Sequence, residues 1–83
     1  MVQGSAVFGK SSSVDVTIDN TYVSRRHFQV RCQDDVFFIS DLDSTNGTYI
    51  NGVKIKRCIL RNNDQITVGD ITITFLEERT REQ

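Results

Sequence analysis

In several segments of this chain, β-branched or aromatic side chains alternate with polar ones at every second position. This alternation is clearest over residues 71–75, where isoleucine and phenylalanine alternate with threonine, and it recurs over 14–18 and 28–33. Because successive side chains of a strand point to opposite faces, this period predicts strands with one face in a core. The apolar run at 36–39 is typical of a strand covered on both faces. No stretch of ten or more residues has a helical period, so the chain is predicted to be all-β.

Turn residues separate the predicted strands at short intervals. Asn51-Gly52 predicts a tight hairpin, because both turn residues must take positive φ and this pair does so cheaply. Gly69-Asp70 and Asp34-Asp35 separate further strands. About six or seven strands at intervals of about 8–12 residues predict a β-sandwich of two mainly antiparallel sheets. The polar segments 19–24 and 41–47 are too long for minimal hairpins, and such loops on a rigid scaffold tend to carry binding residues.

Length and charge exclude several functional classes. A chain of 83 residues buries only about 60–65% of its unfolded surface, which allows one core and no separate catalytic domain. A net charge of −1 at pH 7 argues against general attraction to nucleic acid or to an anionic membrane. No window approaches the ~18 apolar residues of a membrane span, and the N-terminus lacks a secretory signal pattern. We therefore expect a soluble, intracellular domain with neither nucleic-acid nor membrane partners.

The chemistry-bearing residues do not form a catalytic or metal site. His27 is the sole histidine, it lies three residues from Ser24, and no nucleophile-elbow glycine pattern accompanies them. Cys32 and Cys58 are too few for a disulfide framework, and with one histidine they fall short of the four ligands of structural zinc. Residues 41–52 resemble a calcium loop only superficially, because the glycine falls one place late and the bidentate glutamate is missing. We expect no enzyme activity, no metal and no cofactor.

Three segments, in this order and at these spacings, resemble the forkhead-associated (FHA) domain. They are FGK at 8–10, VSRRHF at 23–28 and DLDSTNGTYING at 41–52. A fourth, LRNNDQITVG at 60–69, is similar to the closing strands of that family. The resemblance covers roughly residues 7–76. It implies an FHA/SMAD-like β-sandwich that binds phosphothreonine-containing proteins with loops at one end.

The polar residues of these segments suit a phosphate dianion. Several donors must converge from different loops, since each charge-assisted hydrogen bond contributes only ~1.5–3 kcal/mol. Ser24 and Thr45 offer hydroxyls, and Lys10 and Arg25 offer positive charge. Either hydroxyl taken singly is more simply explained as a turn cap. The resemblance implies that Ser24 and Thr45 contact the phosphate, that Arg25 flanks the phosphothreonine, and that Asn46 hydrogen-bonds the peptide backbone.

Other positions are expected to support or extend the site. Tyr22 matches a family position that reads the third residue after the phosphothreonine, where an aromatic side chain favours an apolar neighbour over an acid. The resemblance makes His27 a buried strut between the two binding loops. Gly47 is interpreted as a residue with positive φ, and Gly9 as structural support. Residues 1–76 are expected to form one domain, followed by a charged tail or linker at 77–83.

Two departures from the family pattern keep an alternative function open. Lys10 replaces the usual arginine and loses its planar, bidentate fork. The family also has one or two strands before Gly9, where only residues 2–8 remain here. An uncovered edge strand invites association, so a homodimer through the N-terminal sheet edge is one expectation. The alternative is thus a phosphate-independent dimerisation or scaffold module.

The resemblance also implies a setting. FHA domains commonly belong to signalling proteins such as kinases, DNA damage-response proteins, transcription factors and ubiquitin ligases. The domain is expected to recruit phosphorylated partners, with the nucleus as the commonest location. The sequence does not choose among these parent proteins.

Overall fold

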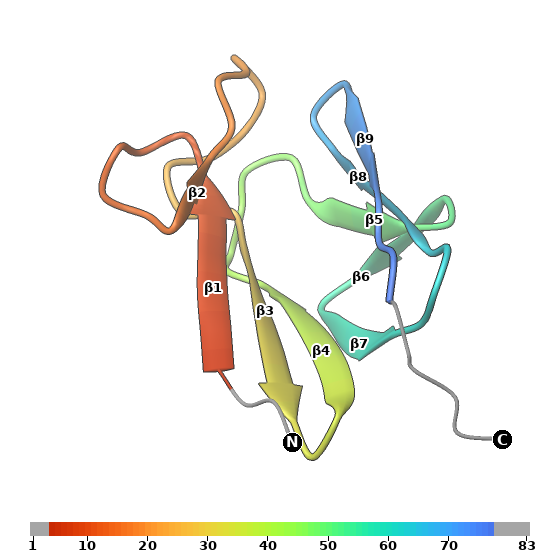
Figure 1. Cartoon of the computed structure of the whole chain (residues 1–83). Coiled ribbons are helices and arrows are strands. Elements are labelled where there is room, and N and C mark those ends of the chain that lie inside the picture. The colour runs from red at the N-terminus through yellow and green to blue at the C-terminus, as the bar shows by residue number, and fades with distance from the viewer. Residues whose placement is uncertain (1–3, 78–83) are drawn as a thin grey trace, which may run out of the picture.

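The computed structural model describes residues 4–77, which form nine strands in two sheets (Figure 1). The strands are β1 (Gly4–Gly9), β2 (Val16–Thr17), β3 (Phe28–Gln33), β4 (Val36–Asp41), β5 (Thr48–Ile50), β6 (Val53–Ile55), β7 (Arg57–Leu60), β8 (Gln65–Val68) and β9 (Ile71–Thr74). The prediction of six or seven strands did not count β1 or β7, neither of which has a clear alternation in sequence, although residues 2–8 were expected to hold what remains of the family's N-terminal strands. Their long neighbours β3 and β4 supply the ladders that define them.

The strands form the predicted β-sandwich. One sheet has the order β2-β1-β3-β4-β7 and the other β6-β5-β8-β9. All pairs are antiparallel except β1 with β2, which run parallel. The inner faces share one apolar core, and its buried members are Ile18, Val23, Phe28, Ile39, Ile50, Leu60, Ile66 and Val68. Among residues 4–77, no helix has the length and hydropathy that a bilayer crossing requires.

The three dipeptide turns lie where the sequence predicts them. Asn51 and Gly52 both have positive φ, at 51° and 85°, and join β5 to β6. Asp34 and Asp35 join β3 to β4 with φ of 54° and 65°, a conformation that short polar side chains tolerate. Gly69 has φ of 60° in the turn between β8 and β9. These turns fix the register of the hairpins that carry the longer loops.

Residues 14–18 form less strand than their alternation predicts. Only Val16 and Thr17 pair with β1, because the Asp15 carboxylate turns to accept a hydrogen bond from the Val7 N–H at 2.8 Å. The Ile18 N–H then donates to the Gly9 carbonyl at 2.7 Å and the side chain of Ile18 enters the core. This segment covers the outer edge of β1 from Val7 onward, so less of that edge is open than the sequence led us to expect.

The prediction for residues 36–39 was half wrong. Phe37 and Ile39 pack in the core, but Val36 and Phe38 lie on the outer face of the five-stranded sheet, where Val36 is 37% exposed. No helix or second sheet covers that face within residues 4–77. An antiparallel sheet of this kind has one solvated side, which explains the difference.

The two cysteines and the tail complete the fold. Cys32 is buried, as expected of a small core side chain, and Cys58 packs half-buried against the core. Burial, with Asp64 nearby, raises the pKa of the Cys58 thiol, consistent with a structural role. Of the expected tail only Glu77 is described, and its N–H donates to the Asn62 side-chain oxygen at 2.8 Å. Residues 78–83 lie outside the described range, so the domain boundary stays a prediction.

Candidate functional site

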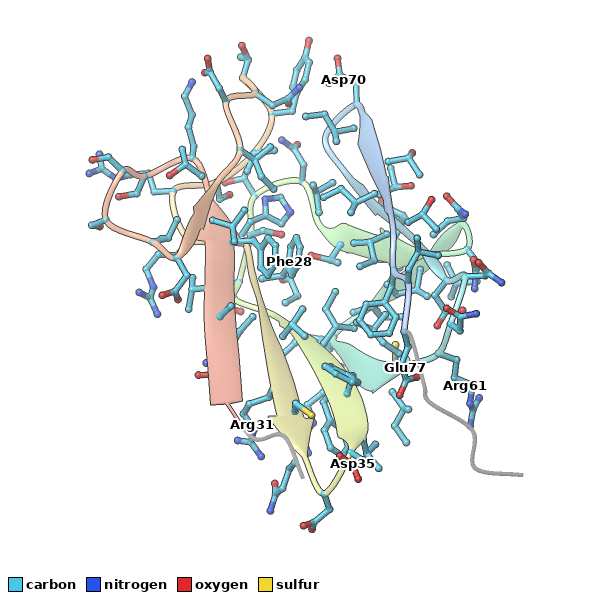
Figure 2. The ribbon with its side chains drawn as sticks, viewed as in Figure 1. Phe28, Arg31, Asp35, Arg61, Asp70 and Glu77 are labelled. Carbon is cyan, nitrogen blue, oxygen red and sulfur yellow. The ribbon has the colours of Figure 1, made fainter. Side chains whose placement is uncertain are left out.

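Three loops meet at one end of the sandwich (Figure 1). We call residues 10–15, between β1 and β2, the first loop, residues 18–27, between β2 and β3, the second loop, and residues 42–47, between β4 and β5, the third loop. Figure 2 marks this end by Asp70 and the opposite end by Asp35.

Gly9 allows the first loop to approach the second. The Lys10 N–H donates to the Ser24 carbonyl at 2.9 Å and the Ser11 N–H donates to the Arg25 carbonyl at 3.1 Å. A Cβ atom on Gly9 would lie 2.1 Å from the Arg25 carbonyl oxygen, so no larger residue fits without movement. The absence of a side chain at Gly9 therefore brings Lys10 beside Ser24 and Arg25.

His27 joins the second loop to the third. It is fully buried, and its Nδ1 accepts a hydrogen bond from the Ser24 N–H at 3.0 Å. Its Nε2 lies 2.8 Å from the Gly47 carbonyl oxygen, and this contact requires the ring proton on Nε2. The His27 carbonyl accepts from the Leu42 N–H at 2.9 Å, and its own N–H donates to the Phe8 carbonyl at 2.8 Å. One residue thus fixes both loops to each other and to β1.

At the surface, the polar side chains of the second and third loops meet. The Thr45 N–H donates to the Ser24 Oγ at 3.0 Å, and the Asn46 Nδ2 donates to the Tyr22 carbonyl at 2.8 Å. Ser24 is half-buried, whereas Tyr22, Thr45 and Asn46 are exposed. The Ser24 hydroxyl accepts one bond and keeps its proton to donate. Within residues 4–77 the Thr45 hydroxyl has no hydrogen-bond partner, so both hydroxyls can serve a ligand.

Two cationic residues, Lys10 and Arg25, adjoin this group through the backbone. Lys10 and Arg25 are exposed, and neither has an ion-pair partner among the described residues. Backbone hydrogen bonds place both residues next to Ser24. The sequence-predicted residues of the three loops are therefore brought to one place. These residues carry two hydroxyls and two positive charges, which is a chemistry suited to an anion.

Asp41 organises the third loop, a role that the sequence analysis missed. Its Oδ1 accepts hydrogen bonds from the Ser44 and Thr48 hydroxyls at 2.6 and 2.7 Å, and its Oδ2 accepts from the Ser44 N–H at 3.1 Å. The Gly47 N–H donates to the Ser44 Oγ at 2.9 Å. Burial raises the pKa of Asp41, but these hydrogen bonds and the nearby His27 outweigh it and lower the pKa overall. An Asp followed three residues later by Ser is the local signal for such a turn.

Asn20 holds Tyr22 in place and was also missed. Its Oδ1 accepts a hydrogen bond from the Tyr22 N–H at 3.0 Å, and its Nδ2 donates to the Asp70 carboxylate. A Cβ on Gly69 would lie 2.7 Å from the Asn20 Oδ1, so the β8–β9 turn packs tightly on the second loop. The signal in the sequence is an asparagine two residues before the residue whose N–H it accepts, typical of an Asx turn.

The site contains no metal centre that the described residues could supply. Across residues 4–77, no three His, Cys, Asp or Glu side chains are placed to hold a metal ion.

Comparison with known proteins gives relatives of one kind. The family model described as FHA domain matches residues 6–69. The glycogen accumulation regulator GarA of Mycobacterium tuberculosis is 34% identical over 68 residues, which are 82% of this chain and 42% of GarA. The oxoglutarate dehydrogenase inhibitor of Corynebacterium diphtheriae is 35% identical over 69 residues, which are 83% of this chain and 48% of that protein. The chain thus spans less than half the length of these curated relatives.

Solved structures agree. A structure from a study of phosphothreonine-dependent FHA domain interactions superposes with a TM-score of 0.91 at 30% identity, covering 96% of this chain and 83% of that one. The N-terminal FHA domain of Saccharomyces cerevisiae Rad53p, in complex with a phosphothreonine peptide, gives a TM-score of 0.73 at 32% identity, with 80% and 56% covered. With a family match over most of its residues and these neighbours, the chain belongs to the FHA domain family.

Proposed function

We propose that this domain binds phosphothreonine-containing segments of partner proteins through its three loops, and that it performs no catalysis. The observation that supports the proposal is the contact between Ser24 and Thr45, in which the Thr45 N–H donates to the Ser24 Oγ at 3.0 Å. Lys10 and Arg25 stand beside them without acidic partners in residues 4–77. A doubly charged phosphoryl group satisfies all four residues at once.

Each residue has a proposed role. Ser24 and Thr45 donate hydroxyl protons to the phosphate, while Lys10 and Arg25 supply positive charge. Asn46 uses one amide proton on the Tyr22 carbonyl and keeps its side-chain oxygen and second proton for the backbone of the peptide. The exposed ring of Tyr22 contacts a residue that follows the phosphothreonine.

The relatives support the class of function. One similar FHA structure comes from a study of phosphothreonine-dependent interactions and another is bound to a phosphothreonine peptide, while GarA is a regulator and the corynebacterial relative an inhibitor. We infer that the domain belongs to an intracellular regulatory protein that is not an enzyme. In that protein it recruits phosphorylated partners. The curated relatives are bacterial, and they lend no support to the nuclear, DNA damage-response role suggested by the family resemblance.

Calorimetry with matched peptides tests the proposal. A phosphothreonine peptide should bind with a dissociation constant of about 0.1–10 µM, and its unphosphorylated form at least ~100-fold more weakly, because the donors of the site then lose their acceptor. Ser24→Ala and Thr45→Ala should weaken binding and change the melting temperature little. Ser5→Ala, an exposed hydroxyl at the far end of β1, is the control. Equal affinity for both peptides would exclude the proposed function.

A second candidate function, phosphate-independent dimerisation, is favoured by one feature of the sheets. The outer edge of β9 (Ile71–Thr74) has no charged side chain, whereas the edge strands β6 and β7 contain Lys54 and Arg57 and β2 has only two residues. Charged residues protect a sheet edge from pairing, and the four residues of β9 include none. The edge of β1, where association was expected from the sequence, is better covered.

Sedimentation velocity over a range of concentrations separates the two candidates. Dimerisation through β9 predicts a dimer that forms without phosphopeptide and that Thr72→Lys/Thr74→Lys disrupts. If the protein is a monomer at every concentration and binds the phosphopeptide, dimerisation is excluded and phosphothreonine recognition remains.

A further inference from the structure

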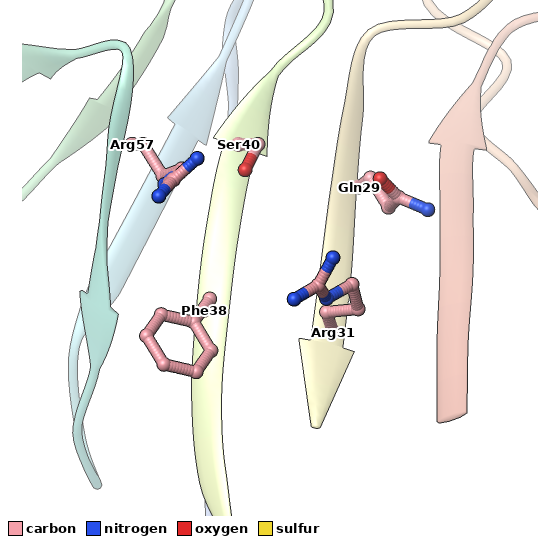
Figure 3. Close-up of a pocket in the computed structure, with 5 residues that line it drawn as sticks. All are labelled: Gln29, Arg31, Phe38, Ser40 and Arg57. Atoms are coloured by element: carbon pink, nitrogen blue, oxygen red, sulfur yellow. The ribbon is translucent and has the colours of Figure 1, made fainter. Parts of the chain in front are cut away.

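The outer face of the five-stranded sheet has a hollow that lies apart from the three loops. A hollow of about 150 Å³ lies on β3, β4 and β7, lined by Gln29, Arg31, Phe38, Ser40 and Arg57 (Figure 3). None of these residues belongs to the three loops. The solvated face of an antiparallel sheet is ordinarily polar, and here a half-buried aromatic side chain, Phe38, lies among polar and cationic ones.

The strand register builds this hollow from residues far apart in sequence. Arg31 pairs with Phe38 across β3 and β4, and Phe38 pairs with Ile59 across β4 and β7. In the next row, Ser40 pairs with Arg57. Phe38 therefore stands between strands that each contribute one arginine, and Ile59, 45% exposed, extends the apolar surface.

The two arginines are available to a ligand. Arg31 makes one side-chain hydrogen bond, to the Gln33 side chain at 3.2 Å, and no carboxylate of residues 4–77 forms an ion pair with Arg31 or Arg57. Figure 3 shows both guanidinium groups reaching toward the hollow from opposite sides of β4. Strands two apart are separated by about 10 Å, a span that two arginine side chains can bridge around one small anionic group.

We propose that this hollow is a second docking site, which takes an acidic segment of a protein partner. A carboxylate side chain of that segment lies between Arg31 and Arg57, and a neighbouring apolar side chain packs on Phe38. The guanidinium fork matches a carboxylate in geometry, and arginine and phenylalanine are enriched at protein interfaces. The chain as a whole has a net charge of −1, which argues against general attraction to a polyanion such as nucleic acid.

The test uses the full 83-residue chain and amide NMR spectra, which detect weak binding. The probe is an unphosphorylated ten-residue peptide of alternating glutamate and leucine, compared with a peptide in which glutamine replaces every glutamate. The glutamate peptide should shift amide signals of 29–31, 38–40 and 57–59 and leave those of 44–46 in place. The glutamine peptide should bind about tenfold more weakly or not at all.

Matched charge reversals complete the design. Arg57→Glu should weaken binding of the glutamate peptide about tenfold, whereas Arg61→Glu, an exposed arginine outside the hollow, makes the same change in net charge and should leave it unaltered. Equal losses for both variants would reduce the effect to general electrostatics and overturn the proposal. The same is true if inorganic phosphate alone reproduces the shifts, or if the shifts fall on the three loops. Because the peptide carries no phosphate, these outcomes are independent of phosphothreonine binding.

Discussion

His27 and Gly9 hold the three loops together in opposite ways. The His27 ring is fully buried; its Nδ1 accepts a hydrogen bond from the second loop and its Nε2 donates one to the third. Gly9 acts through the absence of a side chain, because the Arg25 carbonyl occupies the space where a Cβ would lie. Both residues are buried: His27 fixes Ser24 relative to the third loop, which carries Thr45, and Gly9 allows Lys10 to lie beside Ser24.

Replacing His27 tests the first of these. His27→Ala leaves the part-buried Ser24 N–H and the buried Gly47 carbonyl without partners and opens a cavity, so the free energy of unfolding should fall by about 2–4 kcal/mol. Urea denaturation followed by circular dichroism measures the loss. Arg26→Ala, an exposed neighbour, should change stability by no more than about 0.5 kcal/mol. A His27→Ala protein as stable as Arg26→Ala would show that the ring is not a strut.

Replacing Gly9 tests the second. In Gly9→Ala the new methyl group would overlap the Arg25 carbonyl oxygen, so the first and second loops must separate. We expect a loss of about 1–3 kcal/mol in stability and weaker phosphopeptide binding by calorimetry. Gly4→Ala, at the other end of the same strand, has nothing within 4 Å of its Cβ and should affect neither quantity. If Gly9→Ala binds the phosphopeptide normally, the close approach of the first and second loops is not required for binding.

Among the elements, the third loop depends on the carboxylate at its start. Asp41 is the last residue of β4, and its three hydrogen bonds to Ser44 and Thr48 shape the turn that presents Thr45 and Asn46. A carboxylate that accepts several hydrogen bonds is favoured in its charged form. This is the physical reason for the lowered pKa of Asp41, and it makes the stability of the loop depend on pH.

The sign of that dependence follows from the direction of the shift. The pKa of Asp41 is lower in the folded protein than its ordinary value of 3.8, so the charged carboxylate stabilises the fold above 3.8 and loses this effect as pH falls through the folded pKa. Asp41→Asn should therefore be less stable than the wild type at pH 7, and the difference should shrink below about pH 4. Denaturation curves from pH 7 to pH 2.5 measure it, with Asp34→Asn in an exposed turn as control. A difference that is constant over this range would contradict the prediction.

How far an element could be predicted depended on whether its cause is local. Asn51-Gly52 and Asp34-Asp35 were predicted as turns because the positive φ values are a property of the two residues themselves. β7 was not, because Arg57–Leu60 is defined by pairing with β4 and has no alternation of its own. The hydrogen bonds of Asp41 were not predicted either, because they depend on the backbone conformation of residues 41–48.

At the scale of the whole molecule, the same rule separates what the sequence predicts from what it does not. The sandwich follows from alternation and turn spacing, and the residues of the three loops were predicted as a group because they share one family pattern. The hollow around Phe38 was not, because it exists only through the register of β3, β4 and β7. Residues 36–39 were even assigned to a fully covered strand.

The whole fold also enters the phosphopeptide equilibrium, and this gives a last prediction. The donors of the three loops lie together only in the folded chain, so a phosphothreonine peptide binds the native state and not the unfolded one. At a peptide concentration of 100 times the dissociation constant, the free energy of unfolding should rise by about 2.7 kcal/mol. For a domain of this size, each kcal/mol raises the melting temperature by about 4–8 °C, so the shift in a calorimetric scan should be about 10–20 °C. The unphosphorylated peptide at the same concentration should give almost no shift, and Thr45→Ala should reduce the shift without lowering the melting temperature of the unbound domain. A similar shift with both peptides would mean that the peptide binds by contacts other than its phosphate.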